Sequence, residues 1–246
     1  AALRNAHFLR EKMTEGDRLF RNYKNGRRSI PAFLDDYAFV IEAYLALYQA
    51  TFDEQWLHYA CGHLAHVQAH FFDTNSHLFF YTSDEQETLI NRKIEVQDDV
   101  IPSSNASLAH SLHALGLLYG NPGWLALSRQ MLDNAFADLR RDPSFHAYWG
   151  QRLLKEVFPH YEVAITGAEA QALRAQIEQH YHPGRLFAGA EQASDLPLLQ
   201  DRLGARSTIY VCEGSLCKLP VHTVAEALLL MGTPRQNKGV NGETAV

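Results

Sequence analysis

The sequence predicts a mainly α protein: part of an (α/α)6 six-hairpin barrel with β-hairpin excursions, followed by a small α/β appendage at the C-terminal end. Apolar residues recur at helical spacing in consecutive pairs of segments over residues 1–157. Short strand-like stretches separate certain of these helices, and strands alternate with helices after Phe158-Pro159. We therefore expect half of the barrel over 1–157, the appendage over 158–233 and a disordered tail over 234–246.

The composition is that of a folded chain. Of its 246 residues, 46% are hydrophobic and 20% are charged, which excludes a disordered protein. No apolar run reaches the roughly 20 residues that a membrane helix needs, so we expect no membrane partner. Three cysteines are too few for a disulfide scaffold and indicate a reducing compartment. These features predict a cytoplasmic protein.

Basic side chains are concentrated near the N-terminal end. Residues 1–30 contain eight Lys and Arg against three acidic residues, although the formal net charge of the chain is −6. The basic residues fall on a predicted helix and a predicted hairpin, without a nucleic-acid recognition motif. We interpret them as a solvated face and expect no nucleic-acid partner.

Turn and cap signals divide residues 1–157 into elements. Asn25-Gly26 is the strongest short hairpin signal in the chain, and Asp53 is a candidate N-cap. Pro102-Ser103-Ser104-Asn105 introduces a later helix. Extended pieces are predicted at 18–30, 78–82 and 89–96, and six helices at 3–13, 33–48, 56–71, 106–119, 124–141 and 144–157.

The last third of the chain alternates strands with helices. Gly167 follows the first strand but belongs to no G-x-G-x-x-G motif, so we expect no dinucleotide there and no cofactor. Six helices are half of the twelve in an (α/α)6 barrel. We therefore expect the chain to be the C-terminal part of a longer protein, and the isolated half to self-associate through its inner face. The predicted strands are 161–166, 185–188 and 207–212, and the predicted helices are 168–181 and 223–231.

Two acidic clusters stand at predicted helix starts. Asp35 and Asp36 precede Tyr37 at the start of the 33–48 helix, and Asp98 and Asp99 precede Ser103 and Asn105. Such residues can cap free backbone N–H groups, which is the structural interpretation. In a helical barrel they can also line one mouth, where carboxylates bind sugar hydroxyls or move a proton. We take the second interpretation as the functional hypothesis.

Histidines and cysteines form two weaker patterns. His63, His66 and His70 lie on one helical face, but H-E-x-x-H is absent and no acid or Cys stands at ligand spacing, so we expect no metal. Cys212 and Cys217 bracket a predicted hairpin tip with C-x4-C spacing. They are either reduced structural thiols or a labile cross-hairpin disulfide, and we expect Cys61 in the core.

Several motifs in order resemble one family. FLDDYAFVIEAYLALYQATFDEQWL, LFFYT, DDVIPSSNASLA and YVCEGSLCKLPV resemble the spermatogenesis-associated protein 20-like family, with a match over about residues 1–231. The resemblance implies an N-terminal thioredoxin-like domain joined to a six-hairpin glycosidase-like region similar to N-acylglucosamine 2-epimerases. It also implies that an upstream barrel half and the thioredoxin-like domain of the same parent chain are partners of this segment.

The functional hypothesis is a barrel that binds a sugar-like small molecule and isomerises or hydrolyses it. Asp36 and Asp99 are the predicted catalytic residues. The predicted substrate-binding residues are Asp35, Tyr37, Asp98, Ser103 and Asn105. The alternative is a non-catalytic interaction module of a thioredoxin-domain redox protein. No His aligns with the acid/base histidines of the epimerases.

Overall fold

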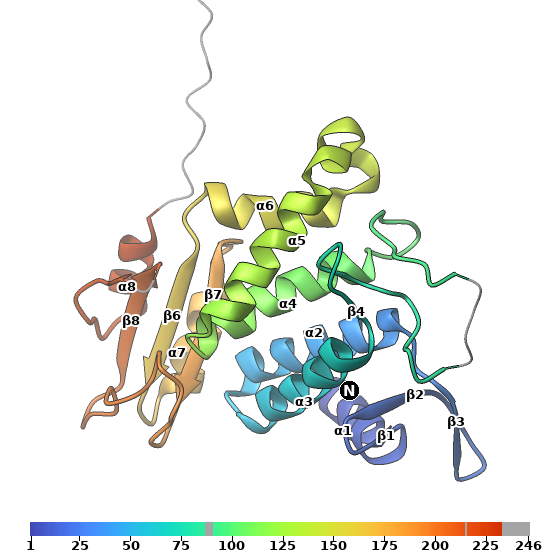
Figure 1. Ribbon diagram of the computed structural model, residues 1–246. Coiled ribbons are helices and arrows are strands. Elements are labelled where there is room, and N and C mark those ends of the chain that lie inside the picture. Colours follow the sequence, from blue (N-terminus) through green and yellow to red (C-terminus); the bar gives the residue numbers. More distant parts are fainter. Residues whose placement is uncertain (87–90, 215, 233–246) are drawn as a thin grey trace, which may run out of the picture.

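The structure is a computed structural model that describes residues 1–86, 91–214 and 216–232. These residues contain eight α-helices and three small sheets, so the mainly α fold class is confirmed (Figure 1). The predicted tail over 234–246 lies outside the described residues. None of the described helices is long and apolar enough to cross a membrane.

The chain begins with a helix and a three-stranded sheet. Helix α1 (Ala2–Lys12) leads into β1 (Thr14–Glu15), β2 (Arg18–Lys24) and β3 (Arg27–Pro31), which pair antiparallel in that order. Asn25 and Gly26 both have positive φ, at 50° and 77°. Two such residues form the two-residue turn whose twist matches a hairpin, so the predicted hairpin is confirmed.

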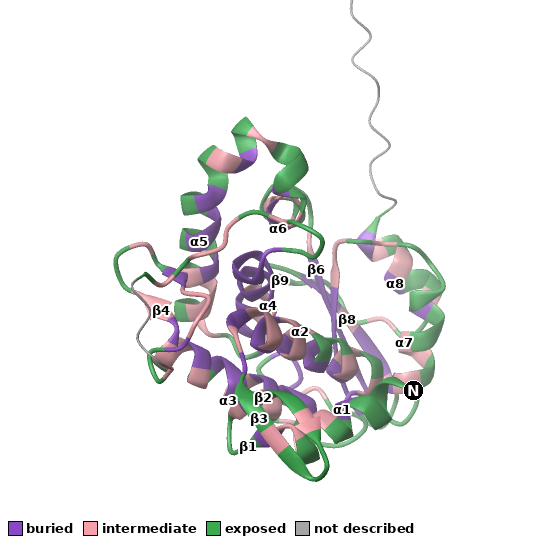
Figure 2. Ribbon diagram, turned by 90° about the vertical axis from the view of Figure 1, so that its right-hand side faces the viewer, coloured by how far each residue is buried: buried purple, intermediate pink, exposed green. Residues whose placement is uncertain are grey.

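Five helices form two layers. In the inner layer, α4 (Ser104–Leu118) packs between α2 (Leu34–Thr51) and α6 (Ala147–Val157). In the outer layer, α3 (Gln55–His70) packs on α2, and α5 (Pro122–Arg141) packs on α4. Figure 2 shows α4 buried along most of its length, whereas α5 carries exposed residues. Helix α4 therefore needs little amphipathic patterning, because neighbours cover most of its surface.

The helix predicted at 144–157 is divided in the structure. A 3₁₀ turn (Pro143–Phe145) precedes His146, whose φ of −139° is outside the helical range. The His146 ring Nδ1 bonds the Asp142 carbonyl at 2.8 Å, which holds this break. Helix α6 then begins at Ala147, and its first N–H groups have no partner within the helix, so a capping side chain can accept them.

The segment between α3 and α4 contains less strand than predicted. Strands β4 (Phe72–Asp73) and β5 (Leu78–Phe79) form a short hairpin, so the strand predicted at 78–82 ends early. In the predicted piece at 89–96, residues 89–90 lie outside the described residues, and the rest makes one isolated bridge, Phe80 to Ile94. The Asn105 side chain hydrogen-bonds the N–H and the carbonyl of Phe79 and the carbonyl of Glu95. These bonds satisfy backbone groups that a partner strand would otherwise pair.

The last part of the described chain is a four-stranded sheet with two helices. The sheet order is β7-β6-β8-β9, with β7 parallel and β8 antiparallel to β6. Helix α7 (Ala170–Glu178) connects β6 to β7, and α8 (Val224–Met231) follows the sheet. The predicted order of strands and helices is confirmed. The strand bounds are β6 (Tyr161–Thr166), β7 (Arg185–Ala190), β8 (Thr208–Glu213) and β9 (Leu216–Cys217).

The sheet packs against the helical body on one face and against α7 and α8 on the other. In β6, Val163 and Ile165 join the core shared with α7 and α8, whereas Ala164 joins the core of the helical body. This alternation is the period of two that a buried strand imposes. Tyr48 and Gln49 of α2 accept the N–H groups of the edge strand β7. The predicted boundary at 157/158 stays a prediction, and the two parts share a core across it.

Candidate functional site

Both predicted acidic clusters lie on the same side of the inner helix layer. The Leu34 N–H, at the start of α2, donates to the Tyr81 carbonyl at 3.0 Å. The Asn105 side chain, at the start of α4, bonds both backbone groups of Phe79, two residues earlier in the same segment. Asp98 then joins the starts of α4 and α6, because it accepts the N–H groups of Ser103 and Tyr148.

Asp35 and Asp36 bind groups of the protein at the start of α2. Asp36 Oδ2 accepts the Phe33 N–H at 2.9 Å, and Asp35 Oδ1 accepts the Asp36 N–H at 2.9 Å. Arg21 of β2 pairs with both carboxylates, at 3.0 Å from Asp36 and 3.6 Å from Asp35. Burial raises the pKa of Asp36 above its usual value, against the opposing effect of the Phe33 N–H. These contacts are those of capping residues, and the catalytic role of Asp36 stays a prediction.

Tyr37 is a buried anchor. Its hydroxyl accepts the Leu19 N–H at 2.8 Å, which ties α2 to the β2 strand. Its ring stacks on His66 with the centroids 5.2 Å apart and is 1% exposed. Burial raises the pKa of Tyr37 to about 12, so the phenol is neutral at physiological pH. The ring is therefore almost closed to a substrate, and its predicted role in binding is untested.

Asp98 and Asp99 differ although they are neighbours. The Asp98 carboxylate accepts the Ser103 N–H and the Tyr148 N–H, each at 2.8 Å, and so serves as a cap for α6. The Asp99 side chain is exposed and makes no hydrogen bond or ion pair within the described part of the chain. Asp99 is therefore available to a ligand, but no neighbouring group orients it.

Ser103 and Asn105 are buried and fully engaged. Ser103 Oγ donates to the Glu95 carbonyl at 3.0 Å and accepts the Ala106 N–H at 3.4 Å. Asn105 makes hydrogen bonds of 2.8, 3.0 and 3.0 Å to Phe79 and Glu95 backbone groups. Their polar atoms stabilise the segment before α4. A ligand would have to displace these bonds to reach them, so their predicted role in binding stays a hypothesis.

A different carboxylate lies at the centre of the inner layer. Glu42 of α2 accepts hydrogen bonds from Ser107 Oγ of α4, at 2.7 Å, and from the Tyr148 hydroxyl of α6. His110, one turn after Ser107, stacks on the Tyr148 ring with a centroid separation of 4.4 Å. Glu42 and Tyr148 are half-buried, so solvent reaches the group. We call Glu42, Ser107, His110 and Tyr148 the Glu42 cluster.

The protonation states of the Glu42 cluster follow from its contacts. His110 Nε2 lies 2.9 Å from the Tyr148 carbonyl, which can only accept, so Nε2 carries the proton. Burial lowers the pKa of His110 to about 3 and keeps its ring neutral at physiological pH. Burial also lowers the pKa of Lys155, a neighbour on α6, to about 8. Burial and the Glu42 hydrogen bond raise the pKa of Tyr148, so its hydroxyl remains a donor.

A buried arginine connects the same helices farther along. Arg152 is 1% exposed and bonds Glu156 at 2.7 Å, Ser128 Oγ at 2.9 Å and His113 Nδ1 at 3.0 Å. Three buried polar atoms of this group have no hydrogen-bond partner in the described chain: Arg152 Nη1, His113 Nε2 and His160 Nδ1. Burial lowers the pKa of His113 to about 2 and that of His160 to about 4.

Sequence reasoning missed the Glu42 cluster. Glu42 interrupts the apolar run of the 33–48 helix, and an acid within an inner helix is the signal that could have identified it. No sequence motif contains Ser107, His110 and Tyr148. These residues come close to Glu42 through the packing of α4 against α2 and α6.

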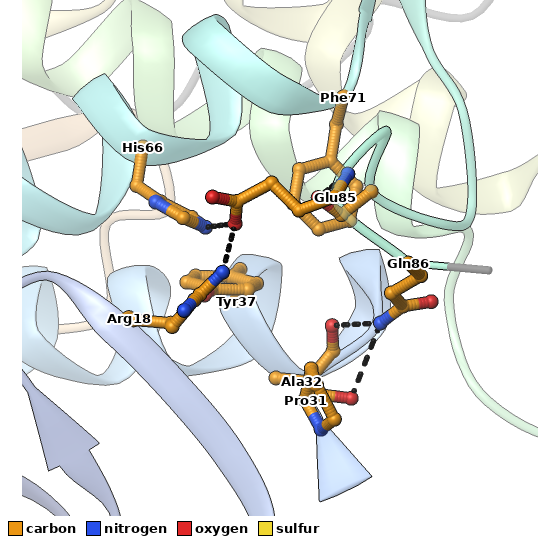
Figure 3. A pocket seen from close by; sticks show the side chains of 9 residues that line it. Arg18, Pro31, Ala32, Tyr37, His66, Phe71, Glu85 and Gln86 are labelled. Carbon is orange, nitrogen blue, oxygen red and sulfur yellow. Dashed lines mark hydrogen bonds and ion pairs between the residues drawn. The ribbon is translucent and has the colours of Figure 1, made fainter.

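A small pocket lies away from the Glu42 cluster, between α2, β2, α3 and the segment before α4 (Figure 3). Arg18 of β2 pairs with Glu85 at 2.6 Å, and His66 of α3 points its Nε2 toward the same carboxylate, 4.0 Å away. The Tyr37 ring forms one wall. In the described residues, the side chains whose donor atoms lie close enough to share a metal ion are His66, His70 and Glu85.

The cysteines form the cross-hairpin disulfide. Cys212 of β8 and Cys217 of β9 are paired residues of the sheet and are bonded to each other, so the alternative of reduced thiols is wrong for this structure. Cys212 is buried and Cys217 is exposed. The Arg202 guanidinium lies 3.2 Å from Cys217 Sγ. Cys61 packs half-buried against the core, and burial raises the pKa of its thiol.

The chain has relatives among curated proteins, whereas no protein-family model matches it. Spermatogenesis-associated protein 20 of Rattus norvegicus is 27% identical over 213 residues, and those of Homo sapiens and Mus musculus are 26% identical over 212 residues. The matches cover 81% of this chain and 27% of each relative, so the chain spans about a quarter of their length. The relationship predicted from the motifs is confirmed: this chain is related to the spermatogenesis-associated protein 20-like family.

Proposed function

We propose that α2, α4 and α6 are inner helices of an (α/α)6 barrel and that the Glu42 cluster binds a carbohydrate there. The two-layer arrangement supports the barrel, because α3 and α5 cover α2 and α4 from outside. The inner helices also begin on one side, as the helices that surround a common mouth must. The proposal concerns binding by this chain, and processing of the bound sugar is its extension.

The observation that carries the proposal is the pair of hydroxyls on Glu42. Ser107 and Tyr148 each donate an O–H to its carboxylate, from two different helices. Vicinal hydroxyls of a sugar can replace these donors or bind beside them, because a carboxylate accepts up to about four hydrogen bonds. The Tyr148 ring adds an aromatic face that can pack against sugar C–H groups. Glu42 is half-buried and so combines access with partial desolvation.

The cluster also contains groups for proton transfer. Glu42 can accept a proton as a general base. Lys155, with its pKa lowered to about 8, can return one as an acid near neutrality, while the Tyr148 hydroxyl serves as a hydrogen-bond donor. Isomerisation and hydrolysis both need such a pair, so these are the reactions we propose. In this proposal Asp36 acts as a cap of α2 rather than as a sugar ligand, and the exposed Asp99 stays a predicted residue of the mouth.

A thermal-shift panel tests the proposal. The full chain is heated with monosaccharides, disaccharides, sugar phosphates and amino sugars, as wild type and as Glu42→Gln. A ligand at about 100 times its Kd stabilises the folded state by about 2.7 kcal/mol. We expect a saturable rise in Tm for one class, and its loss in Glu42→Gln because the amide is a weaker acceptor and donates instead.

Glu54→Gln is the matched control. Glu54 is also half-buried and also accepts a serine hydroxyl, from Ser194 at 2.6 Å, but it lies at the start of α3 outside the inner layer. It should keep the sugar response of the wild type. No response to any sugar, or an equal response in Glu42→Gln, would overturn the proposal.

A second candidate is the interaction module of a thioredoxin-domain redox protein. The disulfide between buried Cys212 and exposed Cys217 favours it, because an exposed sulfur is open to a thiol. Incubation with a thioredoxin-like protein that lacks its resolving cysteine should trap a mixed disulfide on Cys217. Absence of that adduct, with a positive sugar response, would leave carbohydrate binding as the function.

A further inference from the structure

Two histidines and a glutamate converge beside the Tyr37 pocket. His66 and His70 are one helical turn apart on α3, so both side chains lie on the same face. Glu85 comes from the segment after β5, and its two carboxylate oxygens lie 4.0 Å from His66 Nε2 and 4.0 Å from His70 Nε2. The donor atoms of the three residues all lie within 4.8 Å of one another. Small side-chain shifts would bring them to the roughly 3.3 Å separations of ligands around one zinc ion.

The second ring nitrogen of His70 is already occupied. Nδ1 lies 2.9 Å from Asp84 Oδ1, so a neutral His70 donates there and presents an unprotonated Nε2 toward Glu85. A carboxylate on the far nitrogen is the arrangement that orients histidine ligands in metal sites and raises their basicity. It is an observation independent of the closeness of the three donors.

The His66 ring is also held in place. It stacks on Tyr37, with centroids 5.2 Å apart, and lies 4.6 Å from the His70 ring. Tyr37 is fixed in turn by its bond to the Leu19 N–H. The two imidazoles therefore occupy restricted orientations before any ion binds, which reduces the entropy lost on binding.

Arg18 occupies the cation position in this structure. Its guanidinium pairs with Glu85 at 2.6 Å, as Figure 3 shows. The Arg18 side chain is 43% exposed, so it can move into solvent without leaving a buried gap. A divalent ion would replace one positive partner of Glu85 with another, and Arg18 competes with it.

We propose that His66, His70 and Glu85 form a zinc-binding site, with Asp84 as the residue that orients His70. Two histidines and one carboxylate are a ligand set of zinc sites that keep the fourth position for water or substrate. Two of the three proposed ligands, His66 and Glu85, also line the pocket beside Tyr37. The site is separate from the Glu42 cluster, so it does not depend on the carbohydrate proposal.

Metal titration tests the assignment. The full chain, freed of metal by a chelator, is titrated with Co²⁺ for its visible absorption and then with Zn²⁺ against a chromogenic chelator. We expect one ion per chain and an intense Co²⁺ band of four-coordinate type. His70→Asn and Glu85→Gln should each weaken Zn²⁺ binding at least about tenfold, and Asp84→Asn by about tenfold. Arg18→Leu should tighten it, because it removes the competing cation.

His58→Asn is the matched control, because His58 is an exposed histidine of the same helix outside the cluster. It should bind Zn²⁺ as the wild type does. Circular dichroism verifies that each variant is folded. No Zn²⁺ binding by the wild type, or equal affinity in the wild type, His70→Asn and Glu85→Gln, would overturn the proposal.

Discussion

The carboxylates at the helix starts and the carboxylate inside the inner layer have the same chemistry and different partners. Asp36 and Asp98 accept backbone N–H groups, at 2.9 Å and 2.8 Å. Among the described residues, the hydrogen-bond donors to Glu42 are side-chain hydroxyls, those of Ser107 and Tyr148. Backbone donors at a helix start are fixed and have no other partner, whereas hydroxyls rotate and can be exchanged for those of a ligand.

This difference separates stability from binding. Removing a cap leaves buried or half-buried N–H groups without a partner, so it should lower the free energy of unfolding. Replacing Glu42 by Gln leaves the Ser107 hydroxyl within reach of the Ala38 carbonyl, at 3.4 Å, and the half-buried Tyr148 hydroxyl within reach of the amide oxygen or solvent, so it should cost less. The predictions below test this separation in order of expected effect.

Acid should have the largest effect, and it acts on the inner layer. Burial lowers the pKa values of His110, His113 and His160 to about 3, 2 and 4. Each is below the unfolded value of about 6.5, so the unfolded state binds more protons as pH falls. Stability is therefore complete above pH 6.5 and is lost as pH falls toward 4, by up to about 1.4 kcal/mol per pH unit for each histidine.

Urea unfolding at several pH values measures how steeply the free energy of unfolding changes with pH. His110→Gln should reduce it between pH 6.5 and 4.5, because one titrating group is gone. His58→Gln, at an exposed position of α3, should leave it unchanged. An unchanged slope in His110→Gln would show that His110 is already protonated in the folded state.

Asn105→Ala should be the most destabilising of the substitutions among the predicted site residues. It removes three hydrogen bonds and leaves backbone groups of Phe79 and Glu95 without their partner in a buried place. We expect a loss of about 3 kcal/mol in the free energy of unfolding. Asn134→Ala, at an exposed position of α5, should change it by less than about 0.5 kcal/mol. Equal effects in denaturant unfolding would refute the buried role of Asn105.

The sequence predicted the elements better than the site. The Asn25-Gly26 hairpin and the order of strands and helices in the last third of the chain depend on local signals, and these were correct, whereas helix ends differ from the predicted ones by up to three residues. The break at His146 was not predicted, because the Asp98 cap that restarts α6 comes from 50 residues away. Glu42 and Glu85 reach their partners only through tertiary packing, so spacing along the chain could not reveal either cluster.

Asp98→Ala and Asp99→Ala form an adjacent pair with opposite expectations. Asp98 loses two charged hydrogen bonds to the Ser103 and Tyr148 N–H groups, so we expect about 2 kcal/mol of destabilisation. Asp99 is exposed and makes no side-chain bond among the described residues, so its change should be near zero. Thermal or urea unfolding of the two variants measures this difference. Equal losses in the free energy of unfolding would contradict the assignment of Asp98 as a cap.

Asp36→Asn should have the smallest effect of the cap substitutions. The amide oxygen can still accept the Phe33 N–H. The neutral amide also avoids the cost of burying a charge, which is the effect that raises the pKa of Asp36. What is lost is the half-exposed pair with Arg21, worth about 0–1 kcal/mol. A loss above about 2 kcal/mol in urea unfolding would mean that the Arg21 pair dominates the start of α2.

The most direct test of the central claim is calorimetric titration of the best sugar from the panel into Glu42→Gln and Asp36→Asn. Both substitutions replace one carboxylate by an amide on the same helix, so they differ only in place. The account predicts that Glu42→Gln loses binding while keeping its stability within about 1 kcal/mol, and that Asp36→Asn binds within about threefold of the wild type. Binding that survives in Glu42→Gln and disappears in Asp36→Asn would contradict it and place the site at the helix starts.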